Sequence, residues 1–527
     1  MIGRGRAIPF LVSERVAAQV TAVTALLLAL GALPAYPRSA SAGIHHLLVR
    51  ATLSPQRFHS PVSGRMIVLL AKGTEKKQLE LGSVEHDTWI AAREVDGLTP
   101  GASVDVDADQ IAFPTGFSQA PPGDYQLQAF LDEDHSYAYN GLGPGDLFSE
   151  PLTLIGFTPA VSEPIALSLD IEMLPSSAPP APAGIEPLKF ESPSLTAFWG
   201  RPIDITGYVV LPPSYFTSKP KKYPTVYWTH GFGGTLARIE PVAEEYERLM
   251  ASKGMPEMIW VMLNQSFSTG TMEFANSVND GPWGLALTSE LIPRLERQYR
   301  MDAKPNGRFL TGHSSGGWAT LWLQIAYPAI FGGTWSTAPD PADFRSFTGI
   351  DIYATNANAY RKPDGSPRML IRMDGRDVFS FEEYSRREAV TGEYGGQISS
   401  FNWVFSPKGA DGRPMPLFDR ATGIIDSRVA EYWGAHYDIA RKVAREWPRT
   451  GKDLRGKIHV IVGDADTYHL DEPARLLEAK LHELDAGAAF TYIPGKTHSD
   501  LYTDGSDRRA LTKKIAADMY SIARPSK

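Results

Sequence analysis

The amino-acid sequence predicts an α/β fold for the C-terminal two-thirds of the chain, preceded by an all-β, sandwich-like domain. From about residue 187 onward, apolar strand-like runs alternate with helix-like stretches, which favours a mostly parallel sheet with helices on both faces. Between residues 43 and 174, short alternating runs are separated by Pro, Gly and Asp, without a sustained helical period. Residues 175–186 are rich in Pro and Ala and predict a semi-rigid linker.

The elements of the α/β part can be placed in chain order. We expect strands at 205–211, 225–229, 258–263, near 333–336, and at 458–462 and 490–493, with helices near 240–253, 285–299, 317–327 and 472–484. The stretch from about 340 to 455 breaks this alternation and is rich in Arg, Asp, Gly and aromatic residues. We interpret it as an insertion over the functional site. The clearest strands of the all-β part are 46–50, 65–70, 125–131 and 165–169.

The first 42 residues have the pattern of a secretory signal peptide. Three arginines precede an uncharged run at 16–36, and small residues follow at 39–42, which predicts cleavage before Gly43. The prediction is therefore a secreted or periplasmic protein, with an uncleaved anchor as the alternative. No later run approaches a transmembrane length, so we expect the mature protein to be soluble.

Charge and cysteine content exclude several functions. Residues 1–42 hold four arginines and one glutamate, so their removal would change the formal charge from −8 to −11. An acidic exported chain argues against nucleic acid or anionic lipid as the partner. The sequence contains no cysteine, which excludes a cysteine nucleophile, thiolate metal sites, disulfides and a lipid-modified N-terminal cysteine.

The motif with the strongest chemical meaning is Gly312-His313-Ser314-Ser315-Gly316. An apolar run precedes it and a helix-like stretch follows, which is the strand–turn–helix order of a nucleophile elbow. In such a turn the serine backbone is strained, and the flanking glycines avoid collisions, so the hydroxyl points out of the sheet. The positive end of the following helix faces a developing oxyanion. Ser314 is therefore the predicted nucleophile.

A serine nucleophile needs a base within hydrogen-bond reach and a carboxylate that orients the base. In this topology the acid and then the histidine follow the serine, each just after a strand. Asp466 and His498 follow the last two expected strands in that order. We predict Asp466 as the acid and His498 as the base.

Three other aspartates are alternatives for the acid: Asp464, Asp374 and Asp377. Each also follows an apolar run. A metal cluster is a second interpretation of the loop after residue 462, with four candidate ligands: Asp464, Asp466, His469 and Asp471. One catalytic aspartate in a polar loop is the interpretation we prefer, so we predict neither a metal nor an organic cofactor.

The loop after the expected strand 225–229 supplies a second oxyanion donor. Its sequence, His230-Gly231-Phe232-Gly233-Gly234, allows the main chain to turn and to approach a substrate closely. We predict that the backbone N–H groups of Phe232 and Ser315 hold the oxyanion at two points.

With these motifs in place, the catalytic half resembles the "putative esterase" family of α/β-hydrolases, which includes esterase D-type enzymes, feruloyl esterases, enterochelin esterases and mycolyltransferases. The motifs that carry the resemblance are 223–231, 290–296 with Tyr299-Arg300, and 312–317. They cover roughly residues 205–337 well and the rest of the domain loosely.

The resemblance implies an α/β-hydrolase fold with the same site: Ser314 as nucleophile, Asp466 and His498 as its partners, and Phe232 and Ser315 as oxyanion donors. The layout, a sandwich followed by a hydrolase domain, is similar to that of enterochelin esterases. The insertion at about 340–455 departs from the family pattern and leaves the choice of substrate open.

These inferences together predict an exported serine hydrolase that cleaves carboxylic esters through an acyl-enzyme. Acyl transfer or peptide hydrolysis is an alternative on the same chemistry, and a non-catalytic glycan- or polymer-binding protein is an alternative of a different class. The expected partner is a small-molecule or polymer-linked ester. Trp283 and Trp318 are candidates for the wall of its pocket, together with aromatic residues of the insertion such as Trp403 and Trp433.

Overall fold

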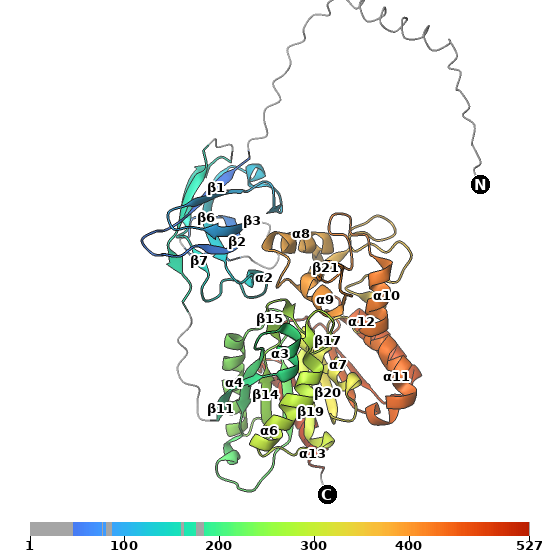
Figure 1. Cartoon of the computed structure of the whole chain (residues 1–527). Coiled ribbons are helices and arrows are strands. Elements are labelled where there is room, and N and C mark those ends of the chain that lie inside the picture. Colours follow the sequence, from blue (N-terminus) through green and yellow to red (C-terminus); the bar gives the residue numbers. More distant parts are fainter. Residues whose placement is uncertain (1–45, 76, 81–86, 160–162, 175–183, 526–527) are drawn as a thin grey trace, which may run out of the picture. The chain divides into compact units, whose positions relative to one another are not determined.

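A computed structural model of the protein describes residues 46–75, 77–80, 87–159, 163–174 and 184–525 (Figure 1). The predicted signal peptide and most of the predicted linker lie outside these ranges, so both stay predictions. None of the described helices has the length and apolar character that crossing a membrane requires.

Strands dominate residues 46–174. β1 (Leu48–Leu53), β4 (Ser103–Asp107) and β9 (Ile165–Leu169) form a three-stranded sheet in the order β4-β1-β9. A second sheet contains β2 (Val62–Lys72), β3 (Thr88–Leu98), β5 (Ala112–Phe113), β6 (Gly123–Asp132), β7 (Leu147–Phe148), β8 (Leu152–Phe157) and β10 (Ile171–Glu172). A short helix, α2 (Tyr137–Asn140), follows β6. The strand content agrees with the predicted all-β character, and the separate sandwich domain stays a prediction.

The central strand β2 is buried on both faces. Met66, Val68 and Leu70 pack into a cluster shared by the two sheets of this region. Ile67 and Leu69 point the other way, because successive side chains of a strand alternate between faces, and they join the large cluster of the C-terminal part. A continuous apolar run in β2 therefore reflects burial on both sides.

The C-terminal part is built on an eight-stranded sheet in the order β11-β12-β14-β13-β19-β20-β23-β24. The strands are β11 (Ile185–Glu191), β12 (Asp204–Val210), β13 (Thr225–Thr229), β14 (Ile259–Leu263), β19 (Arg308–His313), β20 (Gly333–Thr337), β23 (Ile458–Gly463) and β24 (Ala489–Ile493). Six neighbouring strands of this sheet are parallel, namely β14, β13, β19, β20, β23 and β24. At one edge, β12 pairs antiparallel with β14, and β11 pairs antiparallel with β12. The predicted mostly parallel sheet is therefore present.

The edge strand β11 was not foreseen from the sequence. It begins at Ile185, inside the predicted linker, and pairs only with β12. Its Pro187 lacks a backbone N–H and is tolerated because an edge strand leaves one side of its backbone unpaired.

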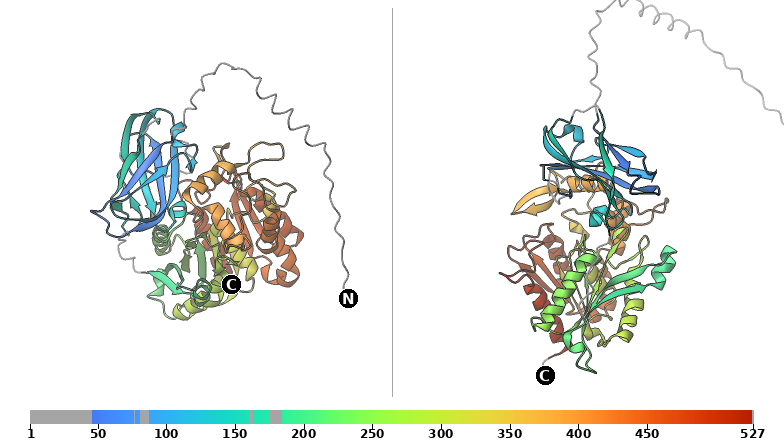
Figure 2. Two further views of the ribbon diagram at one scale, coloured as in Figure 1. Left: turned by 45° about the horizontal axis from the view of Figure 1, so that its top comes forward. Right: turned by 90° about the vertical axis from the view of Figure 1, so that its left-hand side faces the viewer.

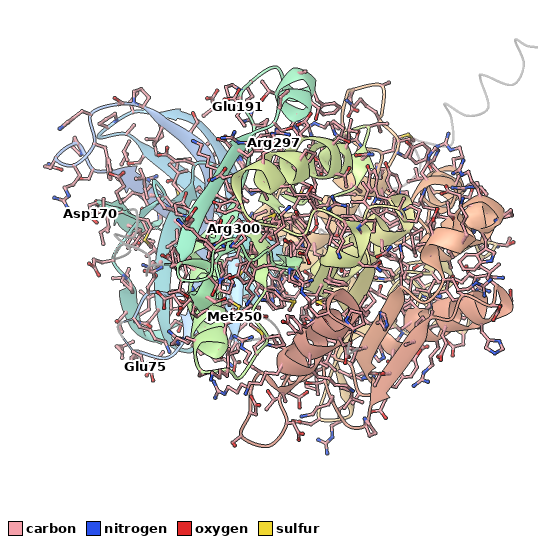
Figure 3. The ribbon with its side chains drawn as sticks, turned by 90° about the horizontal axis from the view of Figure 1, so that it is seen from below. Glu75, Asp170, Glu191, Met250, Arg297 and Arg300 are labelled. Carbon is pink, nitrogen blue, oxygen red and sulfur yellow. The ribbon has the colours of Figure 1, made fainter. Side chains whose placement is uncertain are left out.

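Helices cover both faces of the sheet (Figure 2). Trp260 and Met262 of β14 pack with α4 (Leu236–Ala251) and α13 (Ala510–Ala523) on one face. Val261, from the same strand, packs on the opposite face with α6 (Ile292–Gln298). Met250 lies buried near the end of α4, and Arg297 lies in the last turn of α6 (Figure 3). The expected helices near 240–253 and 285–299 are present, although the second is interrupted by a π-helical turn at 286–291.

Shorter elements complete this part of the chain. They are the helices α3 (Pro193–Trp199) and α5 (Trp283–Leu285) and the short strands β15 (Ser266–Phe267), β16 (Gly270–Thr271), β17 (Asn276–Ser277) and β18 (Gly281–Pro282). Two longer helices carry or follow site residues: α7 (Ser315–Ala326) and α12 (Asp471–Glu483).

The chain between β20 and β23 includes the stretch that the sequence analysis interpreted as an insertion. It contains the hairpin β21 (Met369–Met373) and β22 (Arg376–Ser380) and the helices α8 (Phe381–Thr391), α9 (Gln397–Phe405), α10 (Ser427–His436) and α11 (Ile439–Leu454). Helix α8 begins with a capping box, in which Ser380 and Glu383 satisfy each other's backbone N–H groups. The hairpin therefore passes directly into a helix with a fixed direction.

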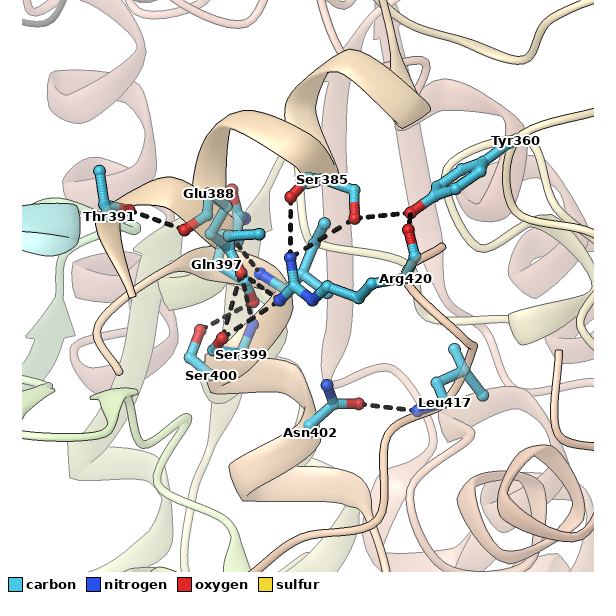
Figure 4. A network of polar contacts seen from close by, with 12 residues as sticks. Tyr360, Ser385, Glu388, Thr391, Gln397, Ser399, Ser400, Asn402, Leu417 and Arg420 are labelled. Atoms are coloured by element: carbon cyan, nitrogen blue, oxygen red, sulfur yellow. Dashed lines mark hydrogen bonds and ion pairs between the residues drawn. The ribbon is translucent and has the colours of Figure 1, made fainter. Parts of the chain in front are cut away.

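The Glu388 carboxylate of α8 connects this helix to α9 and to Arg420, in the chain that follows α9 (Figure 4). The Glu388 carboxylate accepts hydrogen bonds from the backbone N–H groups of Ile398 (2.9 Å) and Ser399 (3.0 Å), which lie in the first turn of α9. Arg420 donates to the same carboxylate at 2.7 Å. First-turn N–H groups lack partners within their own helix, so Glu388 both caps α9 and neutralises Arg420. This network fixes the two helices that face the site.

Candidate active site

Ser314 lies at a strained turn between β19 and α7. Its backbone has φ 58° and ψ −124°, a region that side-chain-bearing residues adopt at a cost of about 1–3 kcal/mol. A Cβ atom on Gly312 would lie 2.3 Å from the Gly316 carbonyl oxygen, and one on Gly316 would lie 2.5 Å from the carbonyl oxygen of Thr229. Only glycine fits at these two positions. The predicted elbow geometry is therefore present, with Ser315 as the first residue of α7.

His498 and Asp466 form a buried pair. The Nδ1 atom of His498 lies 2.8 Å from Oδ2 of Asp466, whose side chain is 0% exposed. Burial alone would raise the pKa of Asp466, but the hydrogen bond and charge of His498 outweigh it, and the pKa is lowered. The backbone N–H groups of Tyr468 and Leu470 assist by donating to Oδ1. With Nδ1 turned to the carboxylate, Nε2 is the ring nitrogen available for proton exchange.

The other three candidate acids take different partners. Asp464 is exposed and accepts a hydrogen bond from the backbone N–H of Gly495 at 2.7 Å. Asp374 lies in the exposed turn between β21 and β22, and Asp377 has an oxygen 3.7 Å from His469. Of the four candidates in the sequence, Asp466 is the one that the structure brings to His498.

The loop after β13 lies directly against the elbow. A Cβ atom on Gly231 would lie 3.0 Å from Cβ of Ser314, so glycine allows this close approach without displacing the elbow. The His230 ring is buried, which lowers its pKa, and its Nδ1 lies 2.7 Å from the Gly231 carbonyl oxygen. Phe232 lines the cavity and packs edge-on against Tyr139, with ring centroids 4.9 Å apart.

Ser314, His498 and Phe232 share one cavity of about 610 Å³. Much of its apolar wall comes from the insertion: Leu370, Ile371, Phe381, Ile398 and Phe401. Tyr384 and Arg387 of α8 extend that wall, and Tyr468 and Tyr502 lie on the side of His498. The stretch that the sequence analysis interpreted as an insertion therefore supplies much of the cavity wall.

Trp283 and Trp318 do not lie where the sequence predicted. Each is 1% exposed and packed in the core, and neither lines the cavity. The indole N–H of Trp283 donates to the carbonyl of Asp280 at 2.9 Å. The ring of Trp318 stacks on that of Trp322, with ring centroids 5.2 Å apart. Helix α7 is buried on all sides, so its aromatic residues fill space beneath the elbow. Trp433 is also a core residue, at 1% exposed.

Two buried carboxyl groups near the elbow were missed by the sequence analysis. Asp340, 4% exposed, has Oδ2 2.7 Å from the Ser315 hydroxyl and Oδ1 3.4 Å from the Ser314 hydroxyl. Glu273 is 1% exposed, and burial together with the charge of Asp340 raises its pKa well above the usual value. Asp340 follows β20 as Asp466 follows β23, a position that could have singled it out. Nothing in the sequence around Glu273 marks that residue.

A serine elbow within a mostly parallel sheet, with a histidine–aspartate pair after the last two strands, is the arrangement of the α/β-hydrolases. The chain matches the family described as "Esterase: Putative esterase" over residues 202–499, more than half of its length, and belongs to that family. It is therefore a carboxylic ester hydrolase.

Solved structures to which the chain is similar include a ferulic acid esterase (16% identity, TM-score 0.38, covering 64% of this chain and 97% of that one). A fluorophosphonate-binding serine hydrolase from Staphylococcus aureus is 13% identical (TM-score 0.34, 65% and 100% covered). An S-formylglutathione hydrolase from Agrobacterium tumefaciens is 12% identical (TM-score 0.36, 64% and 94% covered). No curated protein sequence matches the chain significantly.

Proposed function

We propose that the protein is an exported serine esterase in which Ser314, His498 and Asp466 act as a catalytic triad. The observation that carries the proposal is the 2.8 Å contact between His498 and the buried Asp466, which leaves Nε2 free to act in the cavity that Ser314 also lines. A base held in one tautomer by a carboxylate is what a serine hydroxyl needs to become a nucleophile at neutral pH.

The reaction would proceed in two halves. In the first, Ser314 Oγ attacks the ester carbonyl while His498 Nε2 accepts the hydroxyl proton, and the tetrahedral oxyanion receives hydrogen bonds from the backbone N–H groups of Phe232 and Ser315. Collapse of this intermediate releases the alcohol, which takes the proton from His498. In the second half, His498 removes a proton from water, the hydroxide attacks the acyl-enzyme, and the carboxylic acid leaves as Ser314 regains its proton.

The test is turnover of p-nitrophenyl esters with short and medium acyl chains by the protein that comprises residues 43–527. We expect turnover by the wild type and a loss of about 10⁴-fold or more in Ser314→Ala, because the nucleophile is removed. Ser521→Ala is the matched control, since this serine is exposed on α13. If the wild type is inert, labelling by a fluorophosphonate distinguishes an active serine with a special substrate from a non-catalytic binding protein.

Export is a separate part of the proposal. Its support is the sequence of residues 1–42, with arginines before an apolar run and small residues before Gly43. Expression of the full chain in a bacterial host should yield protein outside the cytoplasm whose N-terminal residue is Gly43. Recovery of uncleaved chain from the cytoplasm would contradict it.

A further inference from the structure

Asp340 is fixed next to the nucleophile by its own backbone. Its N–H donates to the Ser314 carbonyl at 3.2 Å, while the Ser314 N–H donates to the carbonyl of Thr337 at 3.0 Å. Ala338, two residues before Asp340, has φ 38°, which is strained for a residue with a Cβ atom. Prolines at 339 and 341 restrict the chain on both sides. The turn holds the carboxyl group in one place at the expense of local strain.

The two oxygens of Asp340 have different surroundings. Oδ2 accepts a short hydrogen bond, 2.7 Å, from the Ser315 hydroxyl, which lies below the cavity and is fully buried. Oδ1 has a longer contact, 3.4 Å, with the Ser314 hydroxyl. Gln397 lines the same cavity, and burial raises the pKa of Asp340 although the hydrogen bond from Ser315 lowers it. An ionised carboxylate accepts about four hydrogen bonds, so these contacts leave capacity for a further donor.

The triad does not require this carboxyl group. Asp466 already orients His498, and a charge in a largely apolar cavity wall is unfavourable unless it is paired or hydrogen-bonded. Ligand sites combine an apolar lining with a few placed polar groups that select the ligand. Asp340 has that position: it lines the cavity, and its Oδ1 lies beside the atom that attacks the carbonyl carbon.

We propose that Asp340 selects esters that carry a hydrogen-bond donor, a hydroxyl or an ammonium group, on a carbon atom one or two bonds from the scissile carbonyl carbon or its ester oxygen. The inference rests on the proposed function, because Ser314 must be the nucleophile for this distance to matter. The donor can belong to the acyl group or to the alcohol, since both lie near the attacking oxygen. An ester with a methyl group in place of the donor would not form this additional hydrogen bond with Asp340.

The test compares isosteric esters in the wild type. On the acyl side, the p-nitrophenyl esters of lactate, alanine and isobutyrate place a hydroxyl, an ammonium or a methyl group on the α-carbon. On the alcohol side, 2-hydroxyethyl and propyl butyrate differ in the same way. We expect kcat/KM to favour the donor-bearing ester of at least one pair by about 10- to 150-fold, as for one hydrogen bond to a charged group. The pair that responds identifies the side.

The variant Asp340→Asn keeps the shape of the side chain and removes its charge. We expect the ratio of kcat/KM between the two esters of the responding pair to fall below about threefold. A purely structural effect through Ser315 would lower the rate for both esters and leave their ratio unchanged. Asp374→Asn is the control, because this exposed aspartate lies in a hairpin turn with φ 50°, which asparagine tolerates.

Two results would overturn the inference. The first is equal turnover of both members of every pair by the wild type, which would leave the proposed esterase function standing. The second is a preference that survives in Asp340→Asn, which would place the recognition elsewhere. Absence of turnover of all five esters together with absence of fluorophosphonate labelling would instead contradict the proposed function, and this inference with it.

Discussion

Replacing Asp466 by asparagine would exchange one oxygen of a fully buried carboxylate for an NH₂ group. The backbone N–H groups of Tyr468 and Leu470 both donate to Oδ1, at 2.9 and 3.3 Å, so that position must remain an oxygen. The NH₂ group is therefore forced into the place of Oδ2, 2.8 Å from Nδ1 of His498. There it donates to Nδ1, and the neutral imidazole must carry its own proton on Nε2.

A histidine with its proton on Nε2 cannot accept the proton of Ser314. Loss of the productive tautomer and of the negative charge beside the imidazolium costs a serine hydrolase about 4–5.5 kcal/mol of transition-state stabilisation. We therefore expect kcat for a p-nitrophenyl ester to fall by about 10³- to 10⁴-fold in Asp466→Asn. Steady-state kinetics measure the fall, and a thermal melt checks that the variant is folded.

Asp464→Asn is the matched control, because Asp464 is two residues away, exposed, and bonded to the backbone of Gly495. We expect its kcat within about threefold of the wild type. The reasoning is refuted if Asp466→Asn keeps more than a tenth of the activity while folded. It is also refuted if Asp464→Asn loses as much activity as Asp466→Asn.

Two further predictions concern stability. Glu388→Gln should destabilise the insertion by about 3 kcal/mol, because it leaves Arg420 without its charged partner, whereas the exposed Glu393→Gln should cost less than about 1 kcal/mol. Midpoints of urea unfolding measure both, and equal midpoints would contradict the role of the network. Burial raises the pKa of Asp280 to about 7, although a hydrogen bond from the Thr269 hydroxyl lowers this pKa. Between about pH 4 and 7 the folded state then holds a proton that the unfolded state has lost, so stability should fall as pH rises, by roughly 4 kcal/mol at most. Asp280→Asn should remove this part of the pH dependence of the unfolding midpoint, and an unchanged pH dependence would assign it to other groups.

Local sequence determined the elbow and the positions of the main strands along the chain. The glycines around Ser314 are required by contacts of 2.3 and 2.5 Å that any Cβ atom would make, so the pentapeptide alone is a specific signal for the turn. Asp466 and His498 follow β23 and β24 as predicted. These two strands are parallel neighbours, so they end at the same edge of the sheet and bring the two residues close together. Both patterns lie within short segments of the sequence. Within such segments, the spacing of apolar residues and the choice of turn residues indicate where strands and turns lie.

Only the tertiary structure decided which distant side chains meet. Four aspartates fit the sequence pattern of an acid, and the path of the loop after β23 brings Asp466 rather than Asp464 to His498. The tertiary structure also decided which side chains are buried in the core and which line the cavity. Trp283 and Trp318 are core residues, while Asp340 reaches the cavity because of a strained turn. The local sequence around an aromatic residue or an aspartate does not show whether its side chain faces the core or a cavity. The difference arises from packing between segments far apart in the chain, which local propensity does not encode.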